Sequence, residues 1–131
     1  MNDCDDIPNG WQLFHSPSAT SSSDLALSYL ADNPAAHGVA FLVDEQTKGR
    51  GRQGRFWTSN NGDGMYLSVI LAPKRDIMDW ASLSFLTSLS LLQAVQKIVP
   101  GNADKLKLKW PNDVLADGHK IAGILLEAYP P

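Results

Sequence analysis

The 131-residue sequence contains a single cysteine, Cys4, which excludes an intramolecular disulfide framework and a cysteine-rich zinc site. Its three histidines, His15, His37 and His119, lie far apart and show none of the spacings typical of metal ligands. The sequence also lacks the G-x-S-x-G motif of serine hydrolases and a cysteine–histidine signature. We therefore expect a site without metal ligands and without a covalent nucleophile.

Positive charge is also scarce, since 11 lysines and arginines face 14 aspartates and glutamates and give a formal net charge of −3. This balance argues against nucleic-acid binding through bulk positive charge. The longest apolar stretch, residues 80–99, contains too many serines, glutamines and other polar residues for a membrane span. The first ten residues, MNDCDDIPNG, are acidic and polar, unlike a signal peptide. We expect a soluble cytoplasmic protein with no membrane partner.

The composition is that of a folded domain, with 44% hydrophobic and 19% charged residues. We interpret residues 1–10 as a flexible lead-in and residues 11–131 as one domain. The predicted strands cover residues 11–15, 38–44, 65–71, 105–110, 114–116 and 119–128, and the predicted helices cover residues 25–31 and 80–99. This mixture predicts an α+β fold with a mixed or antiparallel sheet packed by helices.

Local patterns define the ends and faces of the elements in the first two thirds of the chain. Serines within residues 16–24 can cap the first helix, which should stop near Asn33. The run MYLSVIL (65–71) is almost entirely apolar, which predicts a strand buried on both faces. Apolar residues recur every three positions from Trp80 to Ile98 and predict a wide apolar stripe on the second helix.

The last third of the chain shows strand and turn patterns. In KLKLKW (105–110) the leucines and Trp110 alternate with lysines, so we expect Lys105 and Lys107 to be solvated. Asp117-Gly118 between two apolar runs is a strong hairpin motif.

The segment between residues 45 and 64 is predicted to be a long glycine-rich loop, and loops of this length inside compact domains usually carry function. Its core, KGRGRQGR, holds four of the 11 cations, namely Lys48, Arg50, Arg52 and Arg55. The interleaved glycines let the backbone approach a ligand and point N–H groups at it. The pattern indicates an anion site, for example for phosphate; a solvated basic loop is the alternative.

The spacing Gly49-x-Gly51-x-x-Gly54 formally matches the dinucleotide-binding fingerprint. Turn-forming residues follow the third glycine instead of a helix, and the region around Lys74, where an acidic residue is expected, is basic. We reject that interpretation.

Residues 109–113, KWPND, form the second candidate site. Lys109 at the end of a strand is a point charge suited to phosphate or carboxylate. Asn112 and Asp113 could belong to the site or could simply cap the turn. Together the two segments offer cations and amides, which stabilise developing negative charge and position reactants.

Four segments in this order resemble the catalytic domain of biotin protein ligases, the biotin–[acetyl-CoA-carboxylase] ligase family: DEQTKGRGRQGRFWTS (44–59), MYLSVIL (65–71), KWPND (109–113) and HKIAGILLE (119–127). The resemblance implies the fold of the biotin/lipoate ligase catalytic domain. It also implies an enzyme that joins biotin to ATP with Mg²⁺, giving biotinyl-5′-adenylate. Biotin then passes to a lysine of a biotin carboxyl carrier domain. A homodimer is compatible with the resemblance.

The resemblance assigns biotin binding to Ser21, Ser22, Gln46, Gly49, Arg50, Arg52 and Lys109. Gln46 would hydrogen-bond the ureido ring, and Gly49 and Arg50 would line biotin through their backbone. Arg52 and Lys109 would act as the catalytic cations, contacting the biotin carboxylate and the phosphate.

The resemblance assigns the adenylate to Arg52, Arg55, Trp57, Lys109, Asn112 and Asp113. Arg55 and Trp57 would help to order the loop around the adenylate. Asn112 and Asp113 would hold the shape of the site, and Lys120 and Gly123 would lie in the hairpin behind it.

Two features depart from the family pattern. The family has Ser-Thr-Asn at the start of its first catalytic-domain helix, where this sequence has Ser21, Ser22 and Ser23. The family's domain also continues beyond the match to GILLE (123–127). We therefore expect a partial catalytic domain, truncated at its C-terminus. The alternative is a catalytically incomplete fragment that binds biotin or a partner without turnover. A single-strand nucleic-acid contact through the loop and its aromatic neighbours is disfavoured by the acidic balance.

Overall fold

A computed structural model describes residues 7–74, 76, 79 and 81–129. The predictions for Cys4, for most of the lead-in and for Trp80 lie outside the described residues. The chain divides into two compact units, residues 1–73 with residue 131, and residues 74–130, here called the N-terminal and C-terminal units. The prediction of one domain over residues 11–131 stays a prediction.

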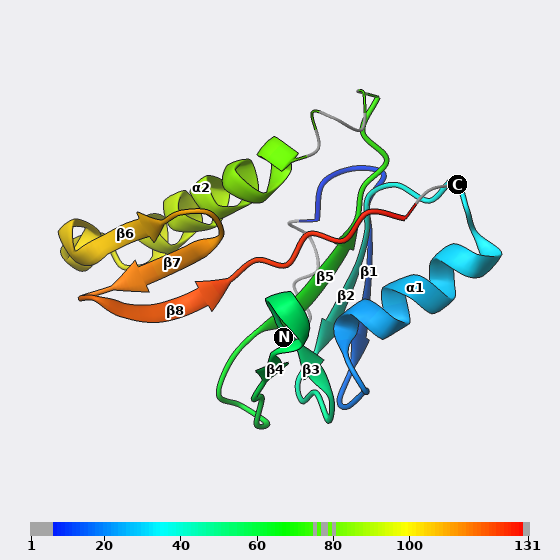
Figure 1. Cartoon of the computed structure of the whole chain (residues 1–131), viewed down its shortest axis with the longest axis horizontal. Coiled ribbons are helices and arrows are strands. Elements are labelled where there is room, and N and C mark those ends of the chain that lie inside the picture. Colours follow the sequence, from blue (N-terminus) through cyan, green and yellow to red (C-terminus); the bar gives the residue numbers. More distant parts are fainter. Residues whose placement is uncertain (1–6, 75, 77–78, 80, 130–131) are drawn as a thin grey trace. The chain divides into compact units, whose positions relative to one another are not determined.

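The N-terminal unit is a three-stranded sheet with one helix (Figure 1). The strands are β1 (Gln12–Ser16), β2 (Val39–Val43) and β5 (Tyr66–Ile70), in the order β1-β2-β5. β1 runs parallel to β2, because helix α1 (Ser22–Asp32) connects them, and β5 runs antiparallel to β2. A mixed sheet packed by a helix confirms the predicted fold class.

The core of this unit lies between α1 and one face of the sheet. Ala26 of α1 packs against Val39, Phe41 and Ile70 of the strands. Phe14 stacks on Phe41 with ring centroids 5.3 Å apart. Burying these apolar surfaces fixes α1 on the sheet and sets the position of its first turn.

The prediction that residues 65–71 are buried on both faces is wrong. Alternate residues of β5 point to opposite faces, and Ser68 and Ile70 point toward α1. Leu67 and Val69 point the other way and are 44% and 40% exposed. An apolar run shows that a strand is hydrophobic, but not that both faces are covered.

The ends of α1 confirm the predicted caps. Ser21 is the N-cap, and its side chain accepts a hydrogen bond of 3.0 Å from the backbone N–H of Asp24. At the other end, the backbone N–H of Asn33 donates to the carbonyls of Tyr29 and Leu30. The helix starts three residues before the predicted range.

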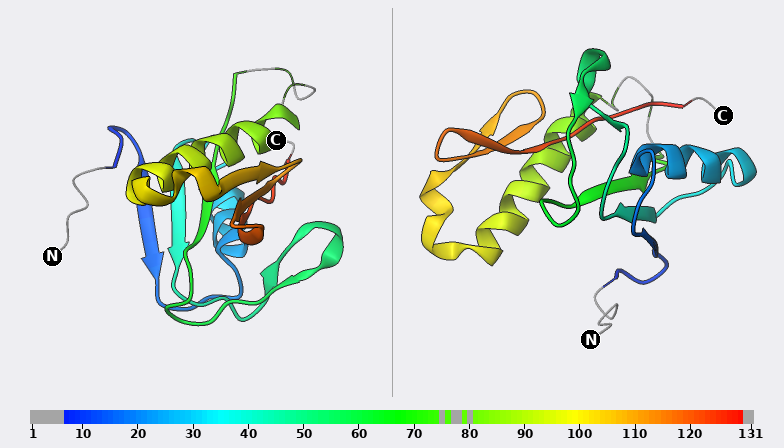
Figure 2. Two further views of the ribbon diagram at one scale, coloured as in Figure 1. Left: turned by 90° about the vertical axis from the view of Figure 1, so that its left-hand side faces the viewer. Right: turned by 90° about the horizontal axis from the view of Figure 1, so that it is seen from below.

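The predicted loop over residues 45–64 contains regular structure, so the expectation of an unstructured loop is wrong in its centre. Strands β3 (Gly49–Arg50) and β4 (Phe56–Trp57) pair antiparallel, with a short 3-10 turn over Arg52–Gly54 between them. Figure 2 shows this hairpin projecting from the sheet of its unit.

The C-terminal unit packs helix α2 (Ala81–Ile98) on an antiparallel meander. A 3-10 helix over Pro100–Lys105 leads into β6 (Leu106–Lys109), β7 (Asp113–Ala116) and β8 (His119–Gly123), which pair in that order.

Two details of the meander bear on the sequence predictions. Asp117 and Gly118 have φ values of +49° and +80°, as a two-residue hairpin requires, so this turn prediction is confirmed. β8 ends at Gly123 instead of residue 128, and Trp110 lies in the turn between β6 and β7 instead of in the strand.

The apolar stripe predicted on α2 is only partly correct. The most buried residue described on this helix is Ser88, at 2% exposure, and its hydroxyl donates to the carbonyl of Ser84. Ile98, a member of the predicted stripe, is 77% exposed. Each residue turns a helix by about 100°, so residues spaced by three drift around its surface and cannot all face one partner.

Neither α-helix among the described residues combines the length and the hydropathy that a membrane span requires.

Candidate functional site

The first turn of α1 meets β5 and the segment that follows β2. Gln46 Oε1 accepts hydrogen bonds from the Ser22 backbone N–H at 2.8 Å and from Ser22 Oγ at 3.2 Å. Ser22 Oγ also lies 2.8 Å from Ser68 Oγ, and Ser23 Oγ lies 3.3 Å from Ser68 Oγ. The structure thus brings Ser22 and Gln46, two of the predicted biotin-binding residues, together with Ser23, while Ser21, a third, caps the helix beside them. Their contact with biotin stays a prediction.

The backbone on both sides of Gln46 is held by the loop before α1. The N–H groups of Thr47 and Lys48 donate to the carbonyls of Ala19 and Thr20, at 2.9 and 2.8 Å. The hydroxyl of Ser59 donates to the carbonyl of Gln46 at 3.1 Å. Gln46 is therefore fixed through its backbone and its side chain, which pre-organises it for binding.

Gly49 begins the hairpin at a position where a side chain does not fit. A Cβ atom there would overlap the carbonyl oxygen of Trp57 and lie 3.0 Å from Gln46 Nε2. The sequence suggested that this glycine allows a ligand to approach. The structure gives a further reason, which is the close approach of β3 to β4.

Arg50 is joined to the start of α1 by an ion pair with the Asp24 carboxylate. Thr20 Oγ1 donates to the same carboxylate at 2.6 Å. The hydrogen bond from Thr20, followed by the charge of Arg50, holds the pKa of the Asp24 carboxyl below its ordinary value of 3.8. The arginine side chain is thus turned to the helix, which leaves its backbone to line a ligand.

The tip of the hairpin carries Arg52 and Arg55, and both residues are exposed. Gln53 and Gly54 have φ values of +59° and +72°, and the N–H of Gly51 donates to the Arg55 carbonyl at 2.7 Å. This tight turn places two exposed arginines at the end of the hairpin.

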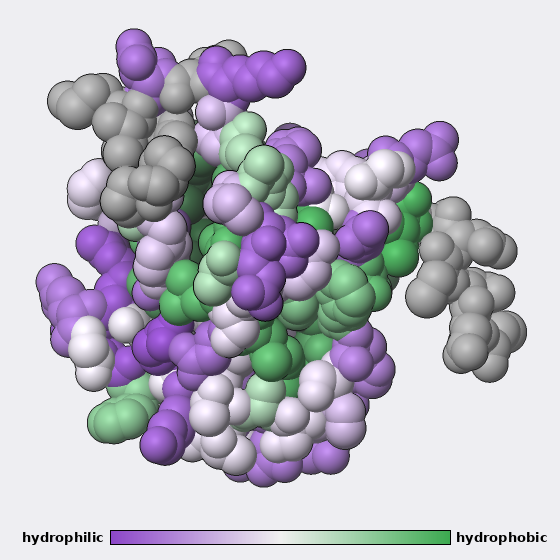
Figure 3. All heavy atoms as spheres, turned by 90° about the vertical axis from the view of Figure 1, so that its right-hand side faces the viewer, coloured by the Kyte–Doolittle hydropathy of each residue, from purple (hydrophilic) through white to green (hydrophobic). Residues whose placement is uncertain are grey.

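A pocket of about 340 Å³ lies beside the hairpin. Its lining combines the segment after β2 with the second strand of the hairpin, over residues 45–49 and 56–59. Figure 3 views the protein from the side of α1 and shows mostly hydrophilic and neutral side chains with hydrophobic atoms between them. A pocket with a glutamine, a lysine and aromatic rings suits a ligand with an apolar ring and polar groups.

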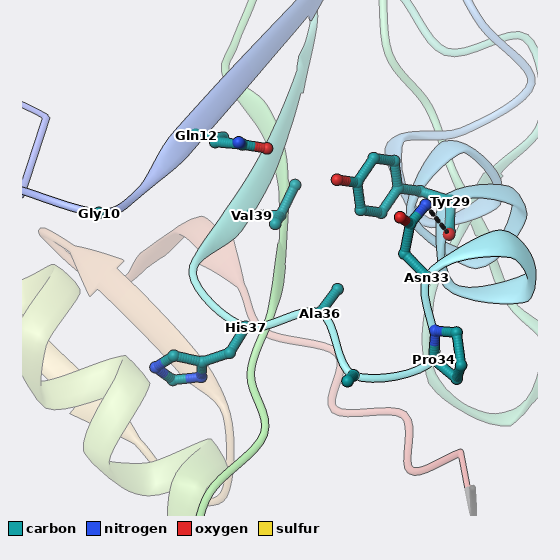
Figure 4. Close-up of a pocket in the computed structure, with 9 residues that line it drawn as sticks. Gly10, Gln12, Tyr29, Asn33, Pro34, Ala36, His37 and Val39 are labelled. Carbon is teal, nitrogen blue, oxygen red and sulfur yellow. Dashed lines mark hydrogen bonds between the residues drawn. The ribbon is translucent and has the colours of Figure 1, made fainter.

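A second pocket, of about 380 Å³, lies at the C-terminal end of α1 (Figure 4). Figure 4 shows the Tyr29 hydroxyl pointing from the helix toward the strand of Val39. Among the described residues that line it, none is a lysine or an arginine. This pocket therefore does not fit the expectation of an anion site.

The KWPND segment lies in the C-terminal unit, and its two ends differ. Lys109 is exposed at the end of β6, opposite Asp113. Asn112 is buried, its Nδ2 donates to the Ile124 carbonyl at 2.7 Å, and Asp113 forms an ion pair with Lys120 at 2.7 Å. The side chains of Asn112 and Asp113 thus tie the start of β7 to β8 and to the residue after it, whereas the structural alternative had been a cap of the turn itself. Their contact with adenylate stays a prediction.

The sequence predicts a site without metal ligands, and the contacts of two histidines are relevant to this prediction. His15 Nε2 lies 2.8 Å from Asp44 Oδ1, and His37 Nδ1 accepts a hydrogen bond from the Ala72 N–H. Over the residues that the structure describes, no group of three or more histidines, cysteines, aspartates or glutamates could hold a metal ion.

Sequence reasoning missed three residues of this site, Asp24, Ser59 and Ser68. Ser68 interrupts an apolar strand, and Asp24 follows the capping serines, so each had a visible sequence feature. Ser59 had none, because its role depends on how the segment after the hairpin returns to Gln46.

The family model described as "Biotin/lipoate A/B protein ligase family" matches residues 16–130. The chain belongs to this family. The biotin–[acetyl-CoA-carboxylase] ligase of Mycobacterium tuberculosis is 34% identical over 125 residues, which are 94% of this chain and 47% of that protein.

Two solved structures of this family share the fold. The biotin protein ligase of Leishmania major in complex with biotinyl-5-AMP aligns with a TM-score of 0.79 and 29% identity, over 90% of this chain and 52% of that one. The biotin protein ligase of Aquifex aeolicus in complex with biotin and ATP aligns with a TM-score of 0.73 and 34% identity, over 89% and 47%. The chain spans about a third to a half of the length of the first curated relatives that it matches.

Proposed function

We propose that this chain provides the biotin-binding part of a biotin protein ligase, which activates biotin with ATP to biotinyl-5′-adenylate and transfers it to a lysine of a biotin carboxyl carrier domain. The observation that carries the proposal is the cluster of Ser22, Gln46, Gly49 and Arg50 at the start of α1. A family member with the same fold was solved with biotinyl-5-AMP, the product of the proposed first step.

The proposed first step requires charge neutralisation and no general base. A biotin carboxylate oxygen attacks the α-phosphorus of ATP, a new P–O bond forms, and pyrophosphate leaves with the electrons of the broken bond. Both reactants are anions, so cations are needed to bring them together. We assign this role to Arg52 and Lys109, both of which are exposed. We assign the ordering of the loop around the adenylate to Arg55 and Trp57.

In the proposed second step, the amine of a carrier lysine attacks the carbonyl carbon of the mixed anhydride. An amide forms, AMP leaves with the C–O electrons, and the lysine loses a proton to solvent. Water competes with the lysine for the anhydride, so the site must exclude water until the carrier arrives.

Mg²⁺ is proposed only as a companion of ATP. The described residues form no carboxylate–histidine cluster of their own for a metal ion. Mg²⁺ in such sites is often held by substrate phosphates, water and one or two carboxylates. The cytoplasmic location, the absence of nucleic acid as a partner and a homodimer stay predictions.

The test is biotin-dependent release of pyrophosphate from ATP by the purified chain, together with a thermal melt. A ligand at about 100 times its Kd stabilises a protein by roughly 2.7 kcal/mol, which raises the Tm by several degrees. A higher Tm with biotin and Mg·ATP together with pyrophosphate release supports the ligase. A higher Tm without pyrophosphate release supports the alternative of a binding fragment, and no rise in Tm contradicts both.

A further inference from the structure

Ser68 is a serine within a strand whose other residues are hydrophobic or aromatic, and it points toward α1. Its hydroxyl lies 2.8 Å from Ser22 Oγ and 3.3 Å from Ser23 Oγ. A partly buried hydroxyl is costly unless it is hydrogen-bonded, so the serine has a defined place in this network.

The direction of the hydrogen bonds in this network follows from the donors available. The backbone N–H of Ser22 can only donate, so its partner on Gln46 is the oxygen Oε1. Ser22 Oγ donates its single hydrogen to the same Oε1. Either hydroxyl can donate in the contacts of Ser68 with Ser22 and Ser23, but with the Ser22 hydrogen on Gln46, Ser22 accepts from Ser68 and Ser68 accepts from Ser23. The hydrogen bonds then all run in one direction, from Ser23 through Ser68 and Ser22 to Gln46.

This order of hydrogen bonds determines which donors and acceptors of the cluster remain for a ligand. Gln46 Oε1 receives two hydrogen bonds, while Nε2, with two hydrogens, bonds to no residue within the described part of the chain. The hydroxyl of Ser23 has already donated, so its lone pairs remain to accept. A cyclic urea presents a carbonyl acceptor flanked by N–H donors, which complements this pair of groups.

We propose that Ser68 is a positioning residue of the biotin site. By donating to Ser22 it keeps the Gln46 amide turned so that Nε2 donates to the carbonyl oxygen of a cyclic urea. Ser68 acts through Ser22 and does not itself contact the ligand. The inference rests on the proposed function, because it takes the contact of Gln46 with the ureido ring, which the resemblance implies, as its starting point.

The experiment is isothermal titration of the 131-residue chain with biotin and with 2-iminobiotin. In 2-iminobiotin a guanidinium group replaces the urea, so the ring has no carbonyl to accept from Nε2. The unaltered chain should prefer biotin. Ser68→Ala should weaken biotin binding about two- to tenfold, the range for one neutral hydrogen bond. It should also reduce the preference for biotin, since Ser22 then no longer holds the amide as firmly.

Two further variants separate positioning from simple structural support. Ser68→Thr keeps the hydroxyl and should restore the preference for biotin. Ser88→Ala removes another buried serine hydroxyl, one that donates to the carbonyl of Ser84, and should leave the preference unchanged.

The possible failures are distinguishable. A Ser68→Ala variant that binds both ligands with the unaltered preference overturns the role of Ser68 and leaves the ligase proposal standing. An unaltered chain that folds cooperatively but binds neither ligand overturns the proposed function and this inference together.

Discussion

The base and the tip of the β3–β4 hairpin are held in different ways. At the base, Gly49 is buried against β4 and Arg50 is ion-paired with Asp24 of α1. At the tip, Arg52 and Arg55 are exposed around a turn with two left-handed residues. The base is therefore pre-formed by the folded unit, whereas the tip presents charge to the solvent. This division suits a site in which fixed groups recognise biotin and exposed cations engage the reacting anions.

The largest effect is expected from a substitution at the base. Gly49→Ala places a Cβ against the Trp57 carbonyl oxygen, so β3 and β4 must separate or shift. Such overpacking typically costs about 1–3 kcal/mol, and the shift would also move Gln46 Nε2. We expect at least a tenfold loss of biotin affinity by calorimetric titration.

Gly51→Ala is the matched control in the same hairpin. A Cβ at Gly51 would meet the Arg55 carbonyl at 3.4 Å, and the backbone there is extended. Its biotin affinity should stay within about twofold of the unaltered chain. Equal losses in the two variants would show that the hairpin base has no special constraint.

The tip is expected to matter for ligand binding. Arg52→Ala removes an exposed cation, so affinity for a non-hydrolysable biotinyl-adenylate analogue should fall by about 1.5–3 kcal/mol. Lys109→Ala, in the C-terminal unit, should behave in the same way. Lys107→Ala, two residues earlier on the same strand and also exposed, is the control and should bind normally. Unchanged affinity in both Arg52→Ala and Lys109→Ala would contradict the assignment of catalytic cations.

Whether a feature depends on local or on distant contacts explains how well the sequence could predict it. The cap at Ser21 and the turn at Asp117-Gly118 depend on a few neighbouring residues, and both were predicted correctly. Which faces of β5 and α2 are buried depends on the elements that pack against them. The pattern of apolar residues alone therefore predicted the buried faces only in part.

The candidate site shows this limit most clearly. Ser22, Gln46 and Gly49 were identified from the resemblance, and the structure brings them together. The supporting contacts of Ser68 and Ser59 join residues that are far apart in the sequence, so they required the fold.

The smallest expected effect concerns the ion pair that links the hairpin base to α1. Thr20 and Arg50 hold the pKa of Asp24 below 3.8, so the folded state binds the Asp24 proton more weakly than the unfolded state does. The stabilisation is then fully present above the ordinary pKa of the carboxyl and is lost as the pH falls through the lowered pKa. Since both side chains are partly exposed, Asp24→Asn should cost only about 0.2–1 kcal/mol at neutral pH.

Urea unfolding of the unaltered chain and of Asp24→Asn, measured between neutral pH and the lowest pH at which the chain folds, tests this sign. The difference in unfolding free energy should be constant at neutral pH and shrink on the acid side of pH 3.8. Asp32→Asn, at the other end of the same helix, is the matched control, because it removes a carboxylate from α1 and leaves the contacts of Asp24 with Thr20 and Arg50 in place. A difference that grows on acidification would mean that Asp24 is protonated more easily in the folded chain. The ion pair between Asp24 and Arg50 would then not stabilise the contact between the hairpin base and α1.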